Sequence, residues 1–329
     1  MRLHRPEPTF LGVPFRDPAQ VRAGEIAIFG AAHGTPYPTN RDAAYEVATG
    51  SAEAPAAIRR AAVQSSSNLD HWDFDLGGPL LADGPATLVD CGDLPTTPAD
   101  GPGNRRLIEQ ATRTLLAAGA VPVLLGGDDS VPIPFHRAYA DRGPAAILQL
   151  DAHIDWRDAI GGERHGYSST MRRASELGFV EAMVQVGARG VGSARREEVE
   201  AALAWGSRIL TAEQVRSSGP EAILAGLPAD MPVLIAVDCD AFDPAALPAV
   251  NAPTPGGLWF HELAAIVRRV AEARRIAGFS LVELAPAADP HGVSATVAAR
   301  LVLNLIGTLA RKTAPGRAID PDTHKQERA

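Results

Sequence analysis

The sequence predicts an α/β fold, a three-layer α/β/α sandwich around a central, mainly parallel β-sheet. Two observations predict this fold class. Apolar segments of strand length alternate along the chain with segments whose apolar residues recur at helical spacing. Several of the strand-length segments are apolar without interruption, which is typical of strands that helices cover on both faces of a parallel sheet.

Each expected element follows from its local pattern of apolar residues and chain breakers. Proline in a first turn marks the helix that begins at Pro132. Residues 32–52 and 66–84 have no such pattern and are expected to be loops. The expected strands are 25–31, 86–90, 121–125, 146–150, 183–187, 208–210, 232–237 and 276–282. The expected helices begin near 54, 132 and 211 and span 104–118, 195–205, 260–273 and 293–310.

Length and composition narrow the class of protein. No linker or internal repeat divides the 329 residues, so we expect one domain over 1–329, with an irregular arm at 1–24 and a loose polar tail at 311–329. The net charge of −8 argues against nucleic acid or an anionic membrane as the main partner. No stretch approaches the roughly 18 apolar residues of a membrane span, and the N-terminus lacks a signal peptide's apolar core. A cytoplasmic protein is expected.

The two cysteines are expected to be reduced core residues. Cys91 and Cys239 each lie at the end of an expected strand. Buried cysteines of this kind behave as small apolar residues, and a cytoplasmic protein seldom forms disulfides. On an extended strand, Cys239 would face away from its polar neighbours.

The central expected strand, 146–150, ends in alternating polar residues. Asp151, His153 and Asp155 follow it directly. If extended geometry continues past Leu150, these three side chains point to the same side, because side chains on a strand repeat with period two. Clustered carboxylates raise one another's pKa and lose hydration, so such a group favours a bound cation. The alternative is a polar strand end with a few surface acids.

Two further expected strands end in the same way. The strand at 232–237 is followed by Asp238 and Asp240, and the strand at 121–125 by a Gly pair with Asp128 and Asp129. Parallel sheets place their chemistry at the carboxyl ends of the strands, so these acids are expected to share one site. Carboxylate oxygens with an imidazole favour manganese, or another first-row divalent ion, over a metal that prefers thiolates.

These motifs, in this order, resemble those of the ureohydrolases, the arginase and agmatinase family, which hydrolyse guanidino compounds to urea and an amine at a binuclear manganese site. The resemblance covers nearly the whole chain and implies the arginase-like version of the sandwich. It also implies a small cationic substrate and a homo-oligomer, either a trimer or a hexamer. The motifs that carry it are 121–130, 146–158, His165-Gly166, 169–174, 185–189, 232–244 and 282–289.

The resemblance assigns a role to each candidate residue. It implies that Glu283 pairs with the substrate guanidinium, that Asp240 stabilises the tetrahedral intermediate, and that His165 passes a proton to the leaving amine. A carboxylate suits bidentate pairing and a histidine suits proton transfer near neutral pH. The implied cofactor is two divalent ions, with manganese expected and nickel or another first-row ion as the alternative. The implied metal ligands are Asp129, Asp151, His153, Asp155, Asp238 and Asp240.

One residue departs from the family pattern. Asp129 stands where the family's Gly-Gly-Asp-His-Ser motif has a histidine ligand of the first metal. The implied ligands then carry a formal charge of about −5 against about +4 from two divalent ions. We expect the change to hold the proton of the bridging water more tightly, to favour a cationic substrate, and to alter the preferred metal or the occupancy of the first site.

The expected function is hydrolysis of a guanidino compound, as an agmatinase, a guanidinobutyrase or a related enzyme. Two alternatives stay open: a hydrolase of another amidine or amide C–N bond, and a catalytically silent subunit of a mixed oligomer. In the loop 32–52, His33 and Tyr37 either border the substrate entrance or pack the loop. Asp243 and Asp289 are expected to shape loops or to support the metal ligands.

Overall fold

The computed structural model describes residues 3–35, 37, 49–82, 88–98 and 100–313. Its centre is an eight-stranded sheet in the order β4-β1-β5-β10-β9-β6-β7-β8, in which every neighbouring pair is parallel. The three-layer prediction is confirmed. The strands are β1 (Ile26–Ala31), β4 (Leu88–Asp93), β5 (Val121–Gly126), β6 (Ala145–Leu150), β7 (Val180–Ala188), β8 (Arg208–Thr211), β9 (Val233–Asp238) and β10 (Ile276–Val282).

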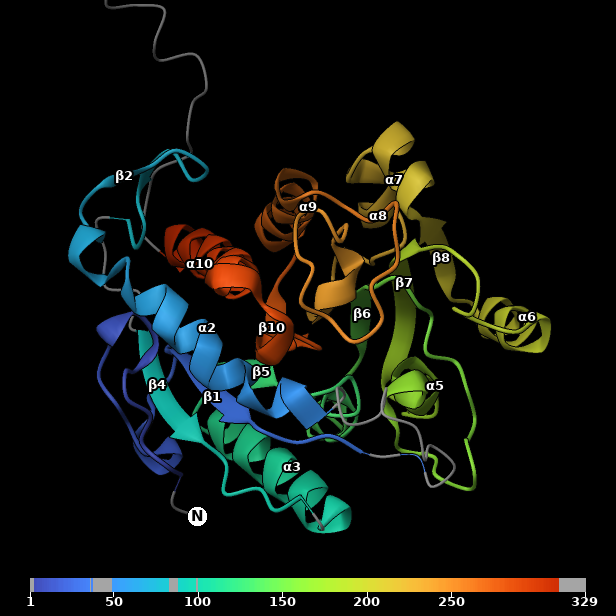
Figure 1. Cartoon of the computed structure of the whole chain (residues 1–329), viewed down its shortest axis with the longest axis horizontal. Helices are drawn as coiled ribbons and strands as arrows, with labels where there is room; N and C mark the ends of the chain where they lie inside the picture. Colours follow the sequence, from blue (N-terminus) through green and yellow to red (C-terminus); the bar gives the residue numbers. More distant parts are fainter. Residues whose placement is uncertain (1–2, 36, 38–48, 83–87, 99, 314–329) are drawn as a thin grey trace, which may run out of the picture.

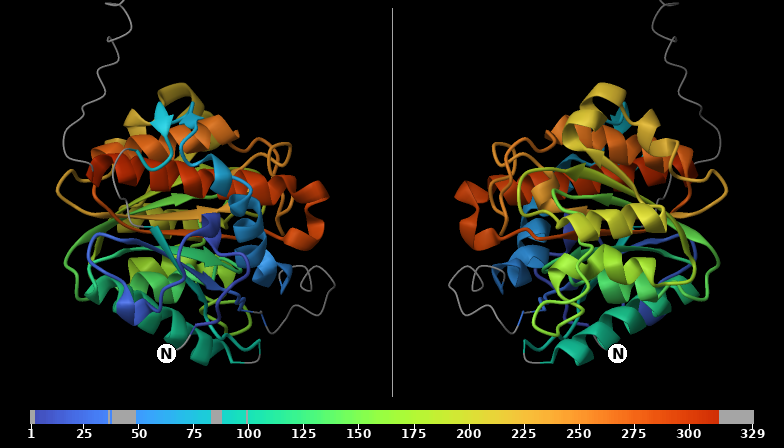
Figure 2. Two further views of the ribbon diagram at one scale, coloured as in Figure 1. Left: turned by 90° about the vertical axis from the view of Figure 1, so that its left-hand side faces the viewer. Right: turned by 90° about the vertical axis from the view of Figure 1, so that its right-hand side faces the viewer.

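Helices cover both faces of this sheet (Figures 1 and 2). Alternate strand residues supply the two cores, as Ile28 and Phe29 show: the first packs with α2 and α10, the second with α3 and α4. One face carries α2 (Ala54–Val63), α7 (Ala212–Ser218), α8 (Glu221–Leu224), α9 (Phe260–Ala273) and α10 (Val293–Thr313). The other carries α3 (Gly101–Ala117), α4 (Pro132–Arg137), α5 (Thr170–Ser175) and α6 (Arg196–Trp205).

The N-terminal arm is irregular, as expected, but it packs closely against the sheet edge. The backbone N–H of His4 donates to the carbonyl of Asp93 (2.8 Å), and that of Arg16 donates to the carbonyl of Asp90 (2.9 Å). Phe10 and Leu11 are buried in the core between the arm and α2. The arm therefore covers the edge strand β4.

Two expectations need correction. Residues 66–84 were expected to be a loop, yet they contain a short antiparallel pair, β2 (Trp72–Asp73) and β3 (Gly78–Pro79). Residues 311–313 were expected in the tail, yet they belong to α10, where Arg311 donates to the carbonyls of Pro79 and Leu80 (2.7 and 3.0 Å). These contacts to β3 stabilise the last turn of α10. The rest of the expected tail, 314–329, lies outside the described residues.

Helix α10 is also more apolar than the sequence reading allowed. Within Pro290–Lys312, an 18-residue window has a mean hydropathy of 1.6, enough by length and composition for a membrane span. In the fold, 78% of that window is buried. The helix packs against α2 and α9 across one face of the sheet, so it is apolar because it is a core helix.

Candidate active site

The polar residues after β6 converge through a turn rather than an extended strand. β6 ends at Leu150, and the backbone N–H of His153 turns back to donate to Asp151 Oδ1 (2.5 Å). Asp155 has φ +44°, a left-handed conformation that is uncommon for a residue with a side chain. The expected extended geometry is therefore wrong, because backbone bonds to the carboxylate bend the chain, but the three side chains still meet.

The residues after β9 meet through a similar turn. Asp238 begins a 3-10 turn, Cys239–Ala241, and its Oδ1 accepts from the backbone N–H of Asp240 (2.7 Å). Asp240 Oδ1 accepts from the backbone N–H of Ala152 (2.9 Å), which joins this turn to the one after β6. Arg189, at the end of β7, donates to the carbonyls of Asp240 and Thr254 (2.6 and 2.8 Å) and fixes the turn from behind.

The loops after β5 and β10 bring Asp129 and Glu283 together. The backbone N–H of Asp129 donates to Glu283 Oε1 (2.8 Å), and Thr170 Oγ1 donates to the Asp129 carbonyl. Glu283 has φ +64°, a second left-handed residue in the site. Backbone strain of this kind persists where the surrounding structure holds it and is frequent at functional sites. The neighbouring Asp128 instead accepts from Thr35 and Ser130 and shapes the loop.

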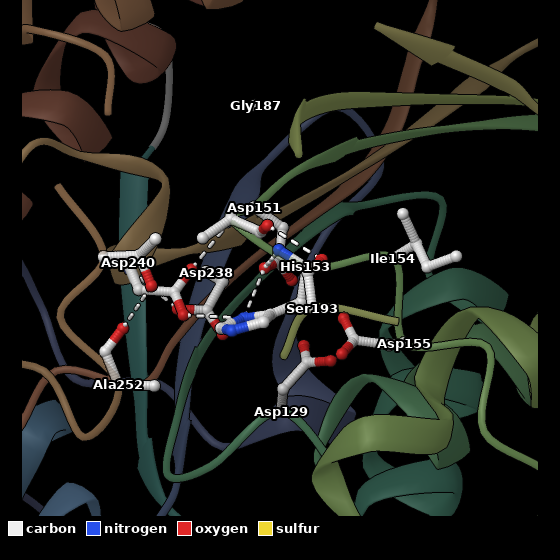
Figure 3. Close-up of polar contacts among 12 residues, drawn as sticks. Asp129, Asp151, His153, Ile154, Asp155, Gly187, Ser193, Asp238, Asp240 and Ala252 are labelled. Carbon is white, nitrogen blue, oxygen red and sulfur yellow. Dashed lines mark hydrogen bonds and ion pairs between the residues drawn. The ribbon is translucent and has the colours of Figure 1, made fainter. Parts of the chain in front are cut away.

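β5, β10, β9 and β6 are consecutive in the sheet, so their carboxyl ends form one surface (Figures 1 and 3). We call Asp129, Asp151, His153, Asp155, Asp238 and Asp240 the acid cluster. Every one of these residues except Asp151 lines a cavity of about 290 Å³, and Glu283 lines it too. The other lining residues are Trp156, Arg157, Tyr167, Ser168, Gly192, Ser193, Glu198, Asn251 and Ala252.

Two groups within the acid cluster have the geometry of a metal site. In one, ligand atoms of Asp129, Asp151 and Asp238 all lie within 4.8 Å of one another, and in the other those of Asp151, His153 and Asp240 do. The buried Asp129 Oδ2 has no hydrogen-bond partner among the described residues. A buried acceptor without a partner is costly, and a divalent cation would satisfy it. The residues therefore fit a pair of adjacent metal ions that share Asp151.

The electrostatics of the acid cluster also favour added positive charge. Burial, and then the charges of neighbouring carboxylates, raise the pKa values of Asp129, Asp151 and Asp238 well above the usual value. Burial likewise raises the pKa of Asp155. These carboxylates cannot all be ionised at low cost while they are close together and buried. A divalent ion among them would lower their pKa values and allow all of them to be ionised.

His153 is the one imidazole in the acid cluster. Its Nδ1 lies 2.9 Å from Asp240 Oδ2 and 3.2 Å from Asp151 Oδ1. Burial alone would lower its pKa, but the hydrogen bonds and charges of these two carboxylates raise it to about 12. Burial opposes ionisation of Asp240 too, yet the bond to His153 leaves the pKa of Asp240 below the usual value. A metal ion would replace the proton on His153, because only the neutral imidazole is a ligand.

Glu283 lies beside the metal-binding groups and has capacity for a further partner. Its Oε1 accepts from Asp129 and its Oε2 accepts from Asn251 Nδ2 (2.6 Å), while an ionised carboxylate can accept about four hydrogen bonds. Burial, followed by the charge of Asp128, raises the pKa of Glu283 to about 8. A cation in the cavity would lower that pKa and pair with the carboxylate.

Residues behind the acid cluster were missed in the sequence. Gln149, the one polar residue in the apolar strand β6, donates from Nε2 to Asp151 Oδ2 (2.8 Å) and Asp155 Oδ2 (2.6 Å). Gln185 Nε2 donates to Gln149 Oε1 (2.6 Å), and Ser207 Oγ donates to Gln185 Oε1 (2.8 Å). This buried chain of hydrogen bonds fixes the Gln149 amide with its N–H groups toward the ligands. A glutamine two residues before a ligand, on the same strand face, was the available signal.

The structure does not bring His165 into the cavity lining. His165 lies in the loop between β6 and α5, where its Nδ1 is 3.3 Å from Glu163 Oε1. Burial and the charge of Arg105 lower its pKa. Gly161 and Gly162 precede it with positive φ angles of 58° and 88°. Its catalytic role stays a prediction.

The other residues singled out in the sequence are structural. His33 is buried and its ring contacts Asn104 Nδ2 (3.0 Å), so it packs the loop and does not line the cavity. Tyr37 lies behind the lining, with its ring 4.8 Å from that of Tyr167 and its hydroxyl accepting from the backbone N–H of Ser168. Asp243 and Asp289 accept backbone N–H groups in their loops, and Cys91 and Cys239 are buried and free.

The fold and the acid cluster together define an α/β/α protein with a candidate metal-binding site, and comparison with known proteins gives its family. The sequence model described as "Arginase family" matches residues 25–307. The chain belongs to the arginase family. Its relatives act on C–N bonds, so the chain is a hydrolase of C–N bonds.

Individual relatives cover most of the chain. It is 31% identical over 315 residues to proclavaminate amidinohydrolase from Streptomyces clavuligerus, covering 92% of this chain and 93% of that protein. It is 32% identical over 275 residues to an agmatinase from Enterobacter sp. (strain 638), covering 80% and 83%. The solved structure of the Streptomyces clavuligerus enzyme has a TM-score of 0.79 at 28% identity, covering 92% of this chain and 97% of that one.

Proposed function

We propose that the chain hydrolyses a small guanidino compound to urea and an amine at a binuclear metal site, with agmatine and 4-guanidinobutyrate as the first candidates. The observation that carries the proposal is the position of Glu283. Glu283 lines the same cavity as members of both metal-binding groups, Asp129 and Asp238 of one and His153 and Asp240 of the other. A guanidinium bound to Glu283 would therefore have its carbon beside the metal positions.

Manganese is the proposed metal, with nickel or another first-row ion as the alternative. Five carboxylates and one imidazole are ligands of the kind that manganese accepts. Bound divalent ions would supply an acidified water, which is the chemistry that hydrolysis of a guanidinium at neutral pH needs. Asp151 would hold both ions, and Gln149 would orient Asp151 from behind.

The protein residues account for binding and proton transfer. Glu283 would pair with the guanidinium nitrogens, and the positive charge of the substrate matches the excess of carboxylates around the cavity. Hydrolysis would add the oxygen of water to the guanidinium carbon and break the C–N bond to the amine, whose nitrogen would take a proton. Asp240 would stabilise the tetrahedral intermediate, and His165 would deliver the proton if its loop moves toward the cavity.

The test is a screen for urea release. Agmatine, 4-guanidinobutyrate, 3-guanidinopropionate, arginine and guanidine would be offered to the protein before EDTA treatment, after it, and after manganese is restored. We expect urea from at least one substrate, loss of activity with EDTA and recovery with manganese. A simple amidine is included as a further substrate.

The outcomes separate the alternatives. Hydrolysis of the amidine without urea from any guanidino compound would favour the broader C–N hydrolase. No hydrolysis and no bound metal would favour the silent subunit, against which the complete acid cluster and Glu283 now argue. The homo-oligomer and the cytoplasmic location remain predictions, which size-exclusion chromatography with light scattering and cell fractionation would test.

A further inference from the structure

We propose that the two metal positions of this chain are chemically unequal and select different cations. The inference rests on the proposed binuclear function and extends it. One position is formed by three carboxylates, those of Asp129, Asp151 and Asp238, and the other by Asp151, His153 and Asp240. We call them the carboxylate position and the imidazole position. They share Asp151, so they are neighbours with different ligand chemistry.

Asp129 is held so that its side chain serves the carboxylate position. Its backbone N–H is engaged by Glu283 and its carbonyl by Thr170, so the backbone is fixed on both sides. Its Oδ2 is buried and has no hydrogen-bond partner among the described residues. The residue is 4% exposed. A fixed backbone and a buried oxygen without a hydrogen-bond partner suit Asp129 to bind a cation.

No nitrogen ligand of the described residues joins this group. Figure 3 shows Asp155 beside Asp129, where it adds a fourth carboxylate. The imidazole of His153 is directed away from Asp129, with Nδ1 between Asp151 and Asp240. The carboxylate position therefore has oxygen ligands alone, while the imidazole position has a nitrogen.

Ligand type decides which cation each position retains. Imidazole favours later first-row ions such as zinc and nickel, whereas carboxylate oxygens suit manganese, magnesium and calcium. Zinc binds most mixed sites more tightly than manganese, and that advantage is smallest where every ligand is a hard oxygen. Zinc should therefore displace manganese first from the imidazole position.

The test is a competition between manganese and zinc. Metal-free protein is dialysed against excess Mn²⁺ and then against rising Zn²⁺, and both metals are counted per chain by mass spectrometry. We expect two steps: about one manganese ion per chain is lost at low zinc, and about one is retained until zinc is much higher. Asp129→His places an imidazole at each position, so both manganese ions should leave together at low zinc. His153→Asp is the mirror variant and should retain both.

The outcomes distinguish this inference from the function on which it rests. Loss of both manganese ions from the parent in one step, at the zinc concentration that empties Asp129→His, overturns the inference and leaves the binuclear site standing. Fewer than about two ions in the manganese-loaded parent overturns both. Thermal unfolding checks that each variant folds. If a variant does not fold, the presence or absence of two steps in the zinc titration of the parent still tests the inference.

Discussion

The sheet carries two buried groups of carboxylates that meet the cost of burial in different ways. We call Arg59, Asp90 and Asp93 the ion cluster. Arg59 Nε and Nη2 donate to the two oxygens of Asp90 (2.8 and 3.0 Å), and Nη1 donates to Asp93 Oδ1 (2.6 Å). Arg59 is fully buried in α2, and Asp90 also accepts from the backbone N–H groups of Phe10 and Gly92. The chain itself supplies the cation here.

The acid cluster sets five carboxylates against one imidazole and opens into a cavity. Four of its carboxylates, those of Asp129, Asp151, Asp155 and Asp238, have raised pKa values, whereas Asp90 has a bidentate guanidinium partner. Burial of carboxylates alone therefore does not indicate a metal site. The useful signs are a deficit of positive charge, an unpartnered oxygen and access to a cavity.

The largest expected effect is on the acid cluster. Asp238→Ala should lose metal and activity together, because Asp238 belongs to the carboxylate position and also holds the turn that carries Asp240. We expect turnover to fall by roughly 10³-fold or more, the scale of several kcal/mol of transition-state stabilisation. Metal counting with a urea assay measures both changes.

Asp243→Ala is the matched control for that variant. Asp243 follows the same strand, and among the described residues its carboxylate accepts only from the backbone N–H groups of Ala245, Gly256 and Gly257. Its metal content and turnover should stay close to those of the parent. Normal metal content and turnover in Asp238→Ala would show that the site has been placed wrongly.

Substitutions in the ion cluster should change the stability of the fold and leave the metal content unchanged. Arg59→Met leaves Asp90 buried without its cation, which should lower the free energy of unfolding by about 3–5 kcal/mol. Adding Asp90→Asn to Arg59→Met should recover part of the loss, because the buried charge is removed. Urea denaturation measures the change, and metal counting should still find about two ions per chain. Loss of metal in Arg59→Met would show that the ion cluster and the acid cluster do not have separate roles.

Glu283→Gln should separate substrate binding from metal binding. A neutral amide cannot pair with the guanidinium charge, so turnover should fall by about 10²-fold, the value of one hydrogen bond to a charged group. Metal content should be retained, because neither metal-binding group includes Glu283. The measurement is the urea-release rate together with a metal count. A collapse of the metal content would identify Glu283 as a ligand or as support for Asp129.

The smallest effect is a pH dependence of stability that metal removes. In the metal-free protein the pKa of Glu283 is raised from 4.5 to about 8, so the folded state binds more protons than the unfolded state within that interval. Its contribution to stability is complete at low pH and is lost as the pH rises to about 8. The raised pKa of His153 acts in the same direction above pH 6.5. Metal binding removes both contributions, because His153 binds a metal only when unprotonated and the charge of the nearby ions lowers the pKa of Glu283.

Thermal unfolding with EDTA and with manganese, between about pH 6.5 and 8, measures this dependence. The stabilisation by manganese should widen with pH by roughly 1.4 kcal/mol per pH unit for each proton involved. His136 is fully buried, and burial lowers its pKa to about 4. Its neutral form therefore destabilises the fold only as the pH falls from 6.5 to about 4, which is below this window. A constant difference between the two curves would contradict the account of the acid cluster.

Much of the fold was predictable because buried parallel strands and amphipathic helices have distinct apolar patterns. β10 at Ile276–Val282 and α9 at Phe260–Ala273 have the bounds that the sequence predicted. The strand order was not predictable, since a crossover helix joins parallel strands whether or not they are neighbours. The packing of the N-terminal arm on β4 also lacked a pattern, because it depends on single backbone bonds such as His4 to Asp93.

The residues of the acid cluster could be predicted to lie together because they follow the ends of apolar strands. The cavity wall was not, since Ser193 and Asn251 come from loops whose course no local pattern fixes. The ion cluster was missed for the same reason: Arg59 lies on a helix and Asp90 on a strand, and only the packing of α2 on the sheet brings them together. Gln149 is visible in the sequence as a polar residue in an apolar strand. Its role as a donor to Asp151 and Asp155 could be recognised only from the positions of those two side chains.

Anomalous diffraction from crystals soaked in manganese locates bound metal directly. We expect two manganese peaks, one at the carboxylate position of Asp129, Asp151 and Asp238 and one at the imidazole position of Asp151, His153 and Asp240. We expect no peak at Arg59, where the guanidinium already neutralises Asp90. A cavity without a manganese peak, or manganese bound away from these residues, would contradict a binuclear metal site in the acid cluster.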